Sequence, residues 1–195
     1  MATIYDLKPA FQNLLRPLVA SLAKAGISPN QITIAALVMS LGMGLALTLT
    51  QGAKWLLVLL PLVLLIRMAL NALDGLLAKE HQMQTPLGAM LNELGDVISD
   101  AALYLPFALL PNISPTLVVL FVITALLTEM AGLLGKTRRY DGPMGKSDRA
   151  FLMGTLGLLL GLNILPSTWV NSILIVALIL SILTIINRCH KGLSQ

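Results

Sequence analysis

The chain has 195 residues, of which 56% are hydrophobic and only 11% are charged. Soluble domains carry about 25% charged residues, so the composition excludes a water-soluble globular protein and also a disordered chain. A single cysteine excludes an internal disulfide and a thiolate metal cluster, and two histidines are too few for a histidine-rich zinc site. The net charge of +4 does not indicate a nucleic-acid partner, because the basic residues flank apolar runs instead of forming a patch with aromatic residues. We therefore predict an integral membrane protein.

The N-terminal segment, residues 1–27, is predicted to form an amphipathic helix. Apolar residues such as Phe11, Leu15 and Leu22 recur there at helical spacing, and Lys8 and Arg16 lie between them. This pattern is typical of an interfacial helix that lies on the membrane surface. A soluble helix packed against the rest of the protein would give the same pattern.

Six apolar stretches follow, and each approaches the roughly 20 residues that span a bilayer. They lie near residues 32–50, 54–78, 87–110, 115–135, 149–165 and 168–187. We predict an all-α membrane protein, with the interfacial helix followed by a six-transmembrane-helix bundle over residues 32–187, in a single domain covering residues 1–195. Gly157 and Gly161 form a small-xxx-small pair, which indicates close packing against another helix.

The basic residues predict the orientation of the bundle. Eleven of the thirteen lysines and arginines lie before the first stretch, after the second, between the fourth and fifth, or after the sixth. Of the other two, Lys54 lies on the opposite side and Arg67 lies within the second stretch. The positive-inside rule therefore places both termini in the cytoplasm.

Several charged residues fall inside the apolar stretches. If they all faced lipid, the cost would be roughly 15–20 kcal/mol, so we expect them to face one another, a cavity or a metal. The simplest interpretation of the two deepest is a buried structural pair between Arg67 and Glu129. The full set is Arg67, Asp74, Glu93, Asp96, Asp100 and Glu129.

Helical geometry brings part of this set together. Asn71 and Asp74 share one face of the second stretch, and Asn92, Asp96 and Asp100 share one face of the third. The two stretches are antiparallel neighbours, so their cytoplasmic halves adjoin. Oxygen ligands on two facing helices form a site for a hard cation, Mg²⁺ or Mn²⁺ rather than zinc.

One run of residues links these positions. It reads Asn71-x2-Asp74-Gly75-x2-Ala78-Lys79-x8-Gly88-x3-Asn92-x3-Asp96. It resembles the signature of the CDP-alcohol phosphatidyltransferases, D-x2-D-G-x2-A-R-x8-G-x3-D-x3-D, at every spacing. The segment Gly26-Ile27-Ser28-Pro29-Asn30-Gln31-Ile32-Thr33 is similar to the one that opens the family's first span. Three positions depart from the signature: Asn71 and Asn92 replace two aspartates, and Lys79 replaces the arginine.

The resemblance implies an enzyme of phospholipid biosynthesis. Such an enzyme moves a phosphatidyl group from a CDP-activated lipid, such as CDP-diacylglycerol, to a small alcohol and releases CMP. It also implies a homodimer, and Asp96 as the catalytic base that takes the proton of the hydroxyl group. In the family the signature aspartates hold two divalent metals. The corresponding metal ligands here would be Asn71, Asp74, Asn92 and Asp96, with Asp100 able to restore one lost charge.

The two asparagines leave three possibilities for the metal site: shifted ligands, one metal, or weak binding. By resemblance, CDP would contact Asn30, Thr33, Gly75, Ala78, Lys79 and Gly88. Asn30 and Thr33 have a second interpretation as caps of the first span, because both residue types favour helix starts.

Four basic residues near the fifth stretch are candidates for binding the phosphate of the acceptor or of the lipid: Lys146, Arg149, Arg138 and Arg139. Positive-inside flanking charge accounts for them equally well. Two other functions stay open: a degenerate homologue that binds CDP-lipid or a partner without turnover, and a small ion-coupled transporter. We expect a multi-pass protein, in the cytoplasmic membrane if the source is bacterial, with its active site on the cytoplasmic side.

Overall fold

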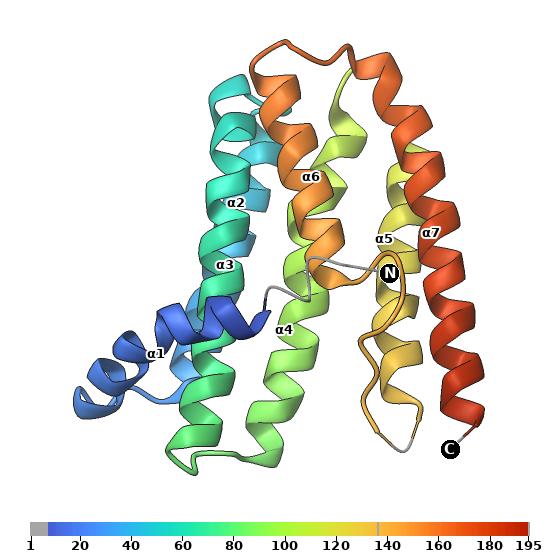
Figure 1. The fold of residues 1–195 in the computed structure, drawn as a ribbon. Helices are drawn as coiled ribbons and strands as arrows, with labels where there is room; N and C mark the ends of the chain where they lie inside the picture. The colour runs from blue at the N-terminus through green and yellow to red at the C-terminus, as the bar shows by residue number, and fades with distance from the viewer. Residues whose placement is uncertain (1–7, 136, 195) are drawn as a thin grey trace.

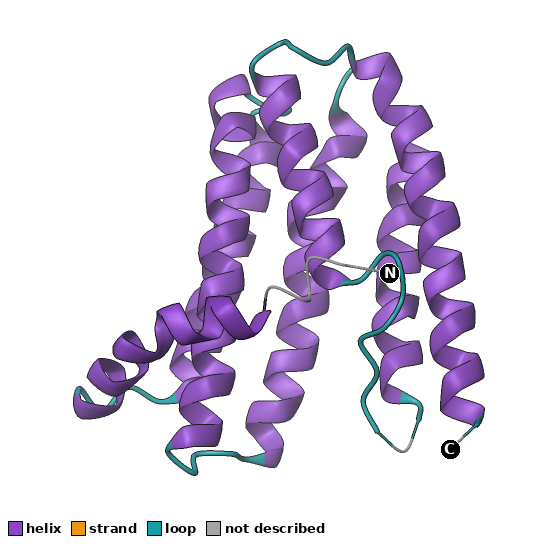
Figure 2. Ribbon diagram, viewed as in Figure 1, coloured by secondary structure: helices purple, strands orange, loops and turns teal. Residues whose placement is uncertain are grey.

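The computed structural model describes residues 8–135 and 137–194, and within them every regular element is a helix (Figure 2). Residues 1–7 of the predicted interfacial helix lie outside the described part. The all-α fold is as predicted from the sequence. The elements are α1 (Lys8–Lys24), α2 (Pro29–Leu49), α3 (Lys54–Glu80), α4 (Pro86–Tyr104), the 3₁₀ helix η2 (Leu105–Leu109), α5 (Pro115–Leu133), α6 (Lys146–Gly161) and α7 (Ser167–Leu193).

Three of these helices begin at a hydroxyl residue followed by proline. Ser28, Thr85 and Ser114 are the N-caps of α2, α4 and α5, and each precedes a proline at the first helical position. Proline suits that position because the N–H it lacks would have no partner inside the helix. The Ser28 hydroxyl accepts the Gln31 N–H at 3.3 Å and the Gln31 side chain accepts the Ser28 N–H at 2.8 Å, which completes a capping box. Ser28 is therefore the cap of α2, and the interpretation of Asn30 and Thr33 as caps is wrong.

The helices α2 to α7 run roughly along one axis, and α1 lies obliquely across the lower part of α3 (Figure 1). α3 packs against α2 and α6, α4 packs against α2, and α5 packs against α7. The connection 81–85 lies at the end of the bundle where α7 ends, and the connection 134–145 begins at that end and rises to the start of α6 (Figure 1). We call this the signature end, because α2 and α4 begin there and α3 ends there.

Small residues allow α6 to approach α3 closely. A Cβ atom at Gly157 would lie 2.9 Å from Leu60 Cδ2, and one at Gly161 would lie 2.7 Å from the Lys54 carbonyl oxygen. The obstructing atom at Gly161 is backbone and cannot move aside, and at Gly157 the Leu57 carbonyl oxygen lies 3.1 Å from the Cβ position, tighter than an ordinary contact. The close packing expected from the Gly157–Gly161 pair is confirmed.

The short helix α1 docks on α3 through one of its sides. Leu15 and Val19 are buried in a cluster that includes Leu77 of α3. Leu14 and Leu18 point away and remain 74% and 52% exposed. The location of α1 on the membrane surface stays a prediction, and these two exposed leucines are the side chains that would enter the lipid.

Among the described helices, α2, α3, α5 and α7 are long and apolar enough to cross a membrane. Their outward-facing side chains are large and apolar, for example Leu45, Leu62, Ile123 and Ile179. The protein is therefore a multi-pass integral membrane protein. α4 and α6, at the third and fifth predicted spans, do not meet the same criterion: α4 contains three carboxylates, and α6 has 16 residues and begins at Lys146.

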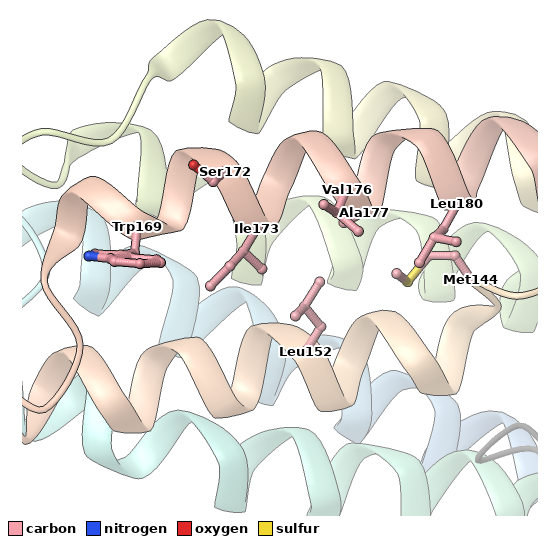
Figure 3. Close-up of a pocket in the computed structure, with 8 residues that line it drawn as sticks. All are labelled: Met144, Leu152, Trp169, Ser172, Ile173, Val176, Ala177 and Leu180. Carbon is pink, nitrogen blue, oxygen red and sulfur yellow. The ribbon is translucent and has the colours of Figure 1, made fainter.

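An open apolar pocket of about 390 Å³ lies between α6 and α7 (Figure 3). Leu152 of α6 and Trp169 and Ile173 of α7 line it, and Met144 lines it from the preceding connection. Its apolar lining sets it apart from the charged residues described next.

Candidate active site and its ionic network

The polar faces of α3 and α4 meet at Asp96. The Asn71 amide donates a hydrogen bond to Asp96 Oδ1 at 2.6 Å. Lys146, the first residue of α6, forms an ion pair with the same oxygen. Arg67 donates a hydrogen bond to the Asp96 carbonyl oxygen at 2.9 Å, and its guanidinium lies 3.5 Å from Asp96 Oδ1. Three nitrogen-bearing side chains from two helices therefore surround one oxygen of Asp96.

Asp74 joins α3 to α2. The Thr33 hydroxyl lies 2.6 Å from Asp74 Oδ2 and 3.1 Å from the Pro29 carbonyl oxygen. A hydroxyl has one proton to donate, and the shorter distance indicates that it goes to the carboxylate. In the part of the chain that the structure describes, no lysine or arginine forms an ion pair with Asp74. Asp74 therefore differs from Asp96, which pairs with Arg67 and Lys146.

The space near Asp74 is bounded by residues with little or no side chain. A Cβ atom at Gly75 would meet nothing within 4 Å, whereas one at Gly88 would lie 2.8 Å from Asn30 Oδ1. Asn30 of α2 and Gly88 of α4 therefore lie against each other. Ala78 is half-buried, and Lys79 is exposed in the last turn of α3. The six positions expected to contact CDP all fall at the signature end.

Asp100 lies deeper in the bundle, between two guanidinium groups. Arg67 Nη1 donates to Asp100 Oδ1 at 2.5 Å, and Arg149 Nη2 donates to Asp100 Oδ2 at 3.4 Å. Both arginines are at most 1% exposed. Charges buried this deeply are tolerated only when they are paired. Both oxygens of Asp100 therefore serve to balance arginines.

Glu129 of α5 extends the chain of charges. It accepts a hydrogen bond from Arg149 at 2.8 Å and lies 3.7 Å from Arg188 of α7. Arg188, 2% exposed, also donates to the carbonyl oxygens of Thr128 and Asp141, at 2.5 Å and 3.0 Å. We call these connected residues the ionic network: Arg67, Asp96, Asp100, Glu129, Lys146, Arg149 and Arg188.

The predicted pair between Arg67 and Glu129 is wrong. Arg67 pairs with Asp100 and Asp96, and Glu129 pairs with Arg149. The reason is the order of the helices in space, since α3 packs against α6 and α2, while α5 packs mainly against α7. A residue on α3 therefore reaches α4 and α6 before it reaches α5.

The connection between α5 and α6 carries two more of the expected phosphate-binding residues. Arg138 forms an ion pair with Glu93 of α4, and its guanidinium lies 4.9 Å from the centre of the Tyr140 ring. Arg139 donates to the Lys191 carbonyl oxygen at 2.9 Å. Arg138, Arg139 and Lys146 keep 28%, 22% and 25% of their side chains exposed, whereas Arg149 keeps none. Only the first three of these cations are accessible to a ligand.

Whether the site suits a divalent cation depends on its oxygen donors. Within residues 8–135 and 137–194, no three His, Cys, Asp or Glu side chains converge as a metal-ligand group. The carboxylates of Asp74 and Asp96 and the amide oxygens of Asn71 and Asn92 are nevertheless the hard donors that Mg²⁺ and Mn²⁺ take. This donor set fits a divalent cation with two charged ligands.

Arg188 is the part of the network that sequence reasoning missed, because it was counted only as a flanking positive charge. A signal was present: Ser181, Thr184 and Arg188 recur at a spacing of three and four residues on an otherwise apolar helix. All three are buried. A polar stripe of this kind on an apolar helix indicates contact with other polar groups inside the protein.

A family model described as CDP-alcohol phosphatidyltransferase matches residues 26–187. The chain is 51% identical over 195 residues to the inner membrane protein YnbA of Escherichia coli (strain K12), and the match covers 98% of this chain and 96% of that protein. It is also 36% identical over 104 residues to an uncharacterized protein of Aquifex aeolicus (strain VF5), covering 53% of this chain and 49% of that one.

The fold is similar to that of phosphatidylinositol phosphate synthase (PgsA1) of Mycobacterium tuberculosis. The crystal structure with CDP-DAG bound has a TM-score of 0.70 and 20% identity, covering 89% of this chain and 90% of that chain. The complex with manganese and citrate has a TM-score of 0.68 and 21% identity, covering 89% and 86%. At these identities the similarity is one of fold.

Proposed function

We propose, because this chain belongs to the CDP-alcohol phosphatidyltransferase family, that it transfers a phosphatidyl group from a CDP-activated lipid to an alcohol and releases CMP. One observation carries the proposal. Residues of the family signature that lie on two helices meet at one point, where the Asn71 amide contacts Asp96 at 2.6 Å. Beside them, Asp74 adjoins the open space at Gly75.

The proposed site lies on the cytoplasmic side of an inner membrane, the membrane named for the relative YnbA. We propose six spans, formed by α2 to α7, with both termini in the cytoplasm. The signature end carries the basic connection 134–145 and the end of α7, which the positive-inside rule assigns to the cytoplasm. A lipid in the inner leaflet and a water-soluble alcohol can both reach that end.

The residues at the signature end have distinct proposed roles. The open space at Gly75 and the short side chain of Ala78 let the CDP phosphates approach α3, with Asn30, Thr33 and Gly88 on the neighbouring helices and Lys79 at its end. The alcohol oxygen forms a bond to the lipid-linked phosphorus, and the bond from that phosphorus to the CMP oxygen breaks. The electron pair leaves with CMP.

Asp96 is the proposed base that takes the proton of the alcohol hydroxyl group. Its Oδ1 accepts from the Asn71 amide and pairs with the Lys146 ammonium. The Lys146 ammonium has three N–H donors and donates one to Asp96, so the others are available to a phosphate oxygen.

A divalent cation, Mg²⁺ or Mn²⁺, held by Asp74 and Asp96 with the amide oxygens of Asn71 and Asn92, would neutralise the pyrophosphate and stabilise the departing CMP phosphate. Asp100 supports this group from behind, because it holds Arg67 against Asp96. Arg138 and Arg139 stay candidates for phosphate contact at the surface, and buried Arg149 would act through Asp100 and Glu129. A homodimer is proposed from family resemblance alone.

The proposal is tested by CMP release from CDP-diacylglycerol with purified protein, Mg²⁺ or Mn²⁺, and a panel of polyols, amino alcohols and phosphorylated alcohols. We expect metal-dependent release that one acceptor increases and that Asp96→Asn reduces by at least about a hundredfold, the scale of a general base. Glu80→Gln, which removes a carboxylate at the same end outside the site, should retain the rate. Folded protein that binds CDP-diacylglycerol but releases no CMP with any acceptor contradicts the proposal.

One observation favours a second candidate, a homologue that binds CDP-lipid without turnover. The proposed base already contacts a lysine and an amide, an arrangement complete without substrate. Asn71→Asp/Asn92→Asp separates the two candidates. Clear CMP release from this variant and none from the original chain would identify a decayed enzyme, whereas a loss of release would identify a site rebuilt around asparagine.

A further inference from the structure

Three arginines converge on the carboxylate of Glu129. Arg149 donates a hydrogen bond to Glu129 Oε1 at 2.8 Å, and Arg188 Nη1 lies 3.7 Å from the same oxygen. Arg138 Nη2 lies 3.8 Å from Oε2. The three cations come from α6, from α7 and from the connection between α5 and α6. One carboxylate therefore occupies the centre of a cluster of three guanidinium groups.

Such a cluster is a common donor set for a phosphate group, because guanidinium groups bind phosphate oxygens through charge-assisted, often bidentate hydrogen bonds. Arg149 and Arg188 are at most 2% exposed, and cations buried this deeply need an anion beside them. Here that anion belongs to the protein itself. A phosphate group that entered the cluster would place a second negative charge against Glu129 in a poorly hydrated site, which is strongly unfavourable.

The arginine cluster adjoins the proposed active site. Glu129 lies one helical turn before the end of α5, at the signature end (Figure 1). Arg149 belongs to the cluster, and Lys146, one turn earlier on α6, pairs with Asp96. The side chains of Glu129 and Arg138 are 12% and 28% exposed, so the cluster is not sealed inside the bundle. A small alcohol whose hydroxyl group reaches Asp96 would therefore have its other substituents close to this cluster.

We propose that Glu129 occupies the anion position of the arginine cluster, and that the acceptor alcohol therefore carries no phosphate group. The inference rests on the proposed function, because it names the acceptor class of that same site. In this arrangement Arg138 and Arg149 bind Glu129 and not the phosphate of an acceptor. Glu129 is a specificity-determining residue, since its carboxylate lies where a phosphorylated alcohol would need to place its own negative charge.

The first test is a titration of purified protein with inorganic phosphate at constant ionic strength, measured by isothermal titration calorimetry. Glu129→Gln removes the negative charge and preserves the size of the side chain, so the three arginines should bind phosphate in place of the carboxylate. We expect this variant to bind phosphate at least about tenfold more tightly than the original sequence.

Two control variants separate the charge of Glu129 from other effects. Glu129→Asp keeps the carboxylate and should bind phosphate no more tightly than the original sequence. Glu93→Gln is the matched control, because it releases only Arg138, whose side chain is 28% exposed, and one exposed guanidinium holds an anion weakly. It should also leave phosphate binding unchanged.

Three results of the titration would overturn the proposal. The first is a folded Glu129→Gln variant that gains no phosphate binding. The second is a gain that Glu93→Gln reproduces. The third is micromolar phosphate binding by the original sequence, which decides the question whether or not any variant folds.

The second test compares acceptors that share a carbon skeleton, glycerol beside glycerol phosphate and inositol beside inositol phosphate, within the panel for CMP release. We expect an unphosphorylated alcohol to give the largest increase with the original sequence, and Glu129→Gln to shift the preference towards the phosphate esters. A phosphate ester as the best acceptor of the original sequence overturns the inference but supports the proposed function. No CMP release with any acceptor contradicts the proposed function, and the phosphate titration still decides whether Glu129 occupies the anion position.

Discussion

Asp100 holds together the most deeply buried part of the ionic network. Its two oxygens bind Arg67 and Arg149, and none of the three side chains is more than 8% exposed. Removing one partner of a buried ion pair strands the other charge and costs about 3–5 kcal/mol. An exposed pair such as Arg16–Glu80, with side chains 60% and 36% exposed, contributes about 0–1 kcal/mol.

These two pairs give a matched prediction. Asp100→Asn should lower the free energy of unfolding by about 3–5 kcal/mol, because two buried guanidinium groups then share a neutral amide. Glu80→Gln should change it by less than about 1 kcal/mol. Unfolding by SDS titration in detergent micelles measures both. Similar effects for the two variants would show that burial does not govern the strength of these pairs.

At the scale of single residues, the sequence could predict which side chains turn inward but not which ones meet. The insertion cost alone requires Arg67, Asp96 and Asp100 to face the interior, and they do. Their partners depend on which helices are neighbours, and no periodicity within one helix contains that information. This is why the Arg67–Glu129 pair was predicted wrongly.

Close packing between α2 and α4 depends on one glycine. A Cβ atom at Gly44 would collide with the carbonyl oxygen of Ala102 in α4, and that oxygen is backbone and cannot rotate away. Gly42, two residues earlier on the same helix, has nothing within 4 Å of its Cβ position. The two glycines therefore differ in packing but share a helix and an amino-acid type.

Gly44→Ala should destabilise the protein by roughly 1–3 kcal/mol, the usual cost of overpacking, because α2 and α4 must separate. Gly42→Ala should be neutral or stabilise by up to about 1 kcal/mol, since alanine favours a helix over glycine. Thermal unfolding of the two variants in the same detergent measures the contrast. Equal melting temperatures would mean that α2 and α4 are not packed as described.

The connection 134–145 is fastened to α7 by Asp141. Its carboxylate lies 2.9 Å from Lys191 Nζ and accepts from the Asn187 amide at 3.0 Å. Partial burial acts to raise the pKa of Asp141, but the hydrogen bond from Lys191 and the charges of Lys191 and Arg139 outweigh it. The pKa therefore lies below its usual value of 3.8.

A lowered pKa in the folded state means that ionised Asp141 stabilises the docked connection. The stabilisation is complete above the ordinary aspartate pKa and is lost as the pH falls through the lowered one. We expect the Arg139 amide, which donates to Gly132 at 2.8 Å, to exchange with deuterium roughly two- to fivefold faster in Asp141→Asn at neutral pH. The ratio of the two exchange rates should approach one in strong acid. A ratio independent of pH would contradict the role of the charge.

The boundaries of two elements show what hydropathy can and cannot predict. The sixth apolar stretch was predicted to end at 187, whereas α7 continues to Leu193. Apolar character ends where the membrane ends, but backbone hydrogen bonding continues into water. The third stretch was predicted as one helix over 87–110, whereas α4 ends at Tyr104 and a 3₁₀ helix follows with Pro106 in its first turn. Proline lacks the N–H needed to continue an α-helix.

Chemical labelling of the single cysteine can test the predicted orientation of the molecule in the membrane. Cys189 is exposed near the end of α7, at the signature end of the bundle. Thr168, in the first turn of α7, is exposed at the opposite end. With the signature end in the cytoplasm, the two positions lie on opposite sides of the membrane.

We expect Cys189 to resist a membrane-impermeant maleimide in intact cells and to react after permeabilisation. A Cys189→Ser/Thr168→Cys variant should react in intact cells. Labelling followed by gel-shift analysis measures both. The opposite labelling pattern would show that the orientation in the membrane is inverted and that the candidate site lies on the outer side.

The ionic network also bears on how the chain enters the bilayer as it is made. Arg67 is synthesised 33 residues before Asp100, and Glu129 is synthesised 20 residues before Arg149. In each pair the earlier helix, α3 or α5, is long and apolar enough to cross a membrane, whereas the later one is either interrupted by three carboxylates (α4) or only 16 residues long (α6). The less apolar helix of each pair is therefore synthesised after the residue that neutralises its charge has entered the membrane. The order of synthesis matches the order in which these charges can be neutralised, so α4 and α6 need never cross the lipid unaccompanied.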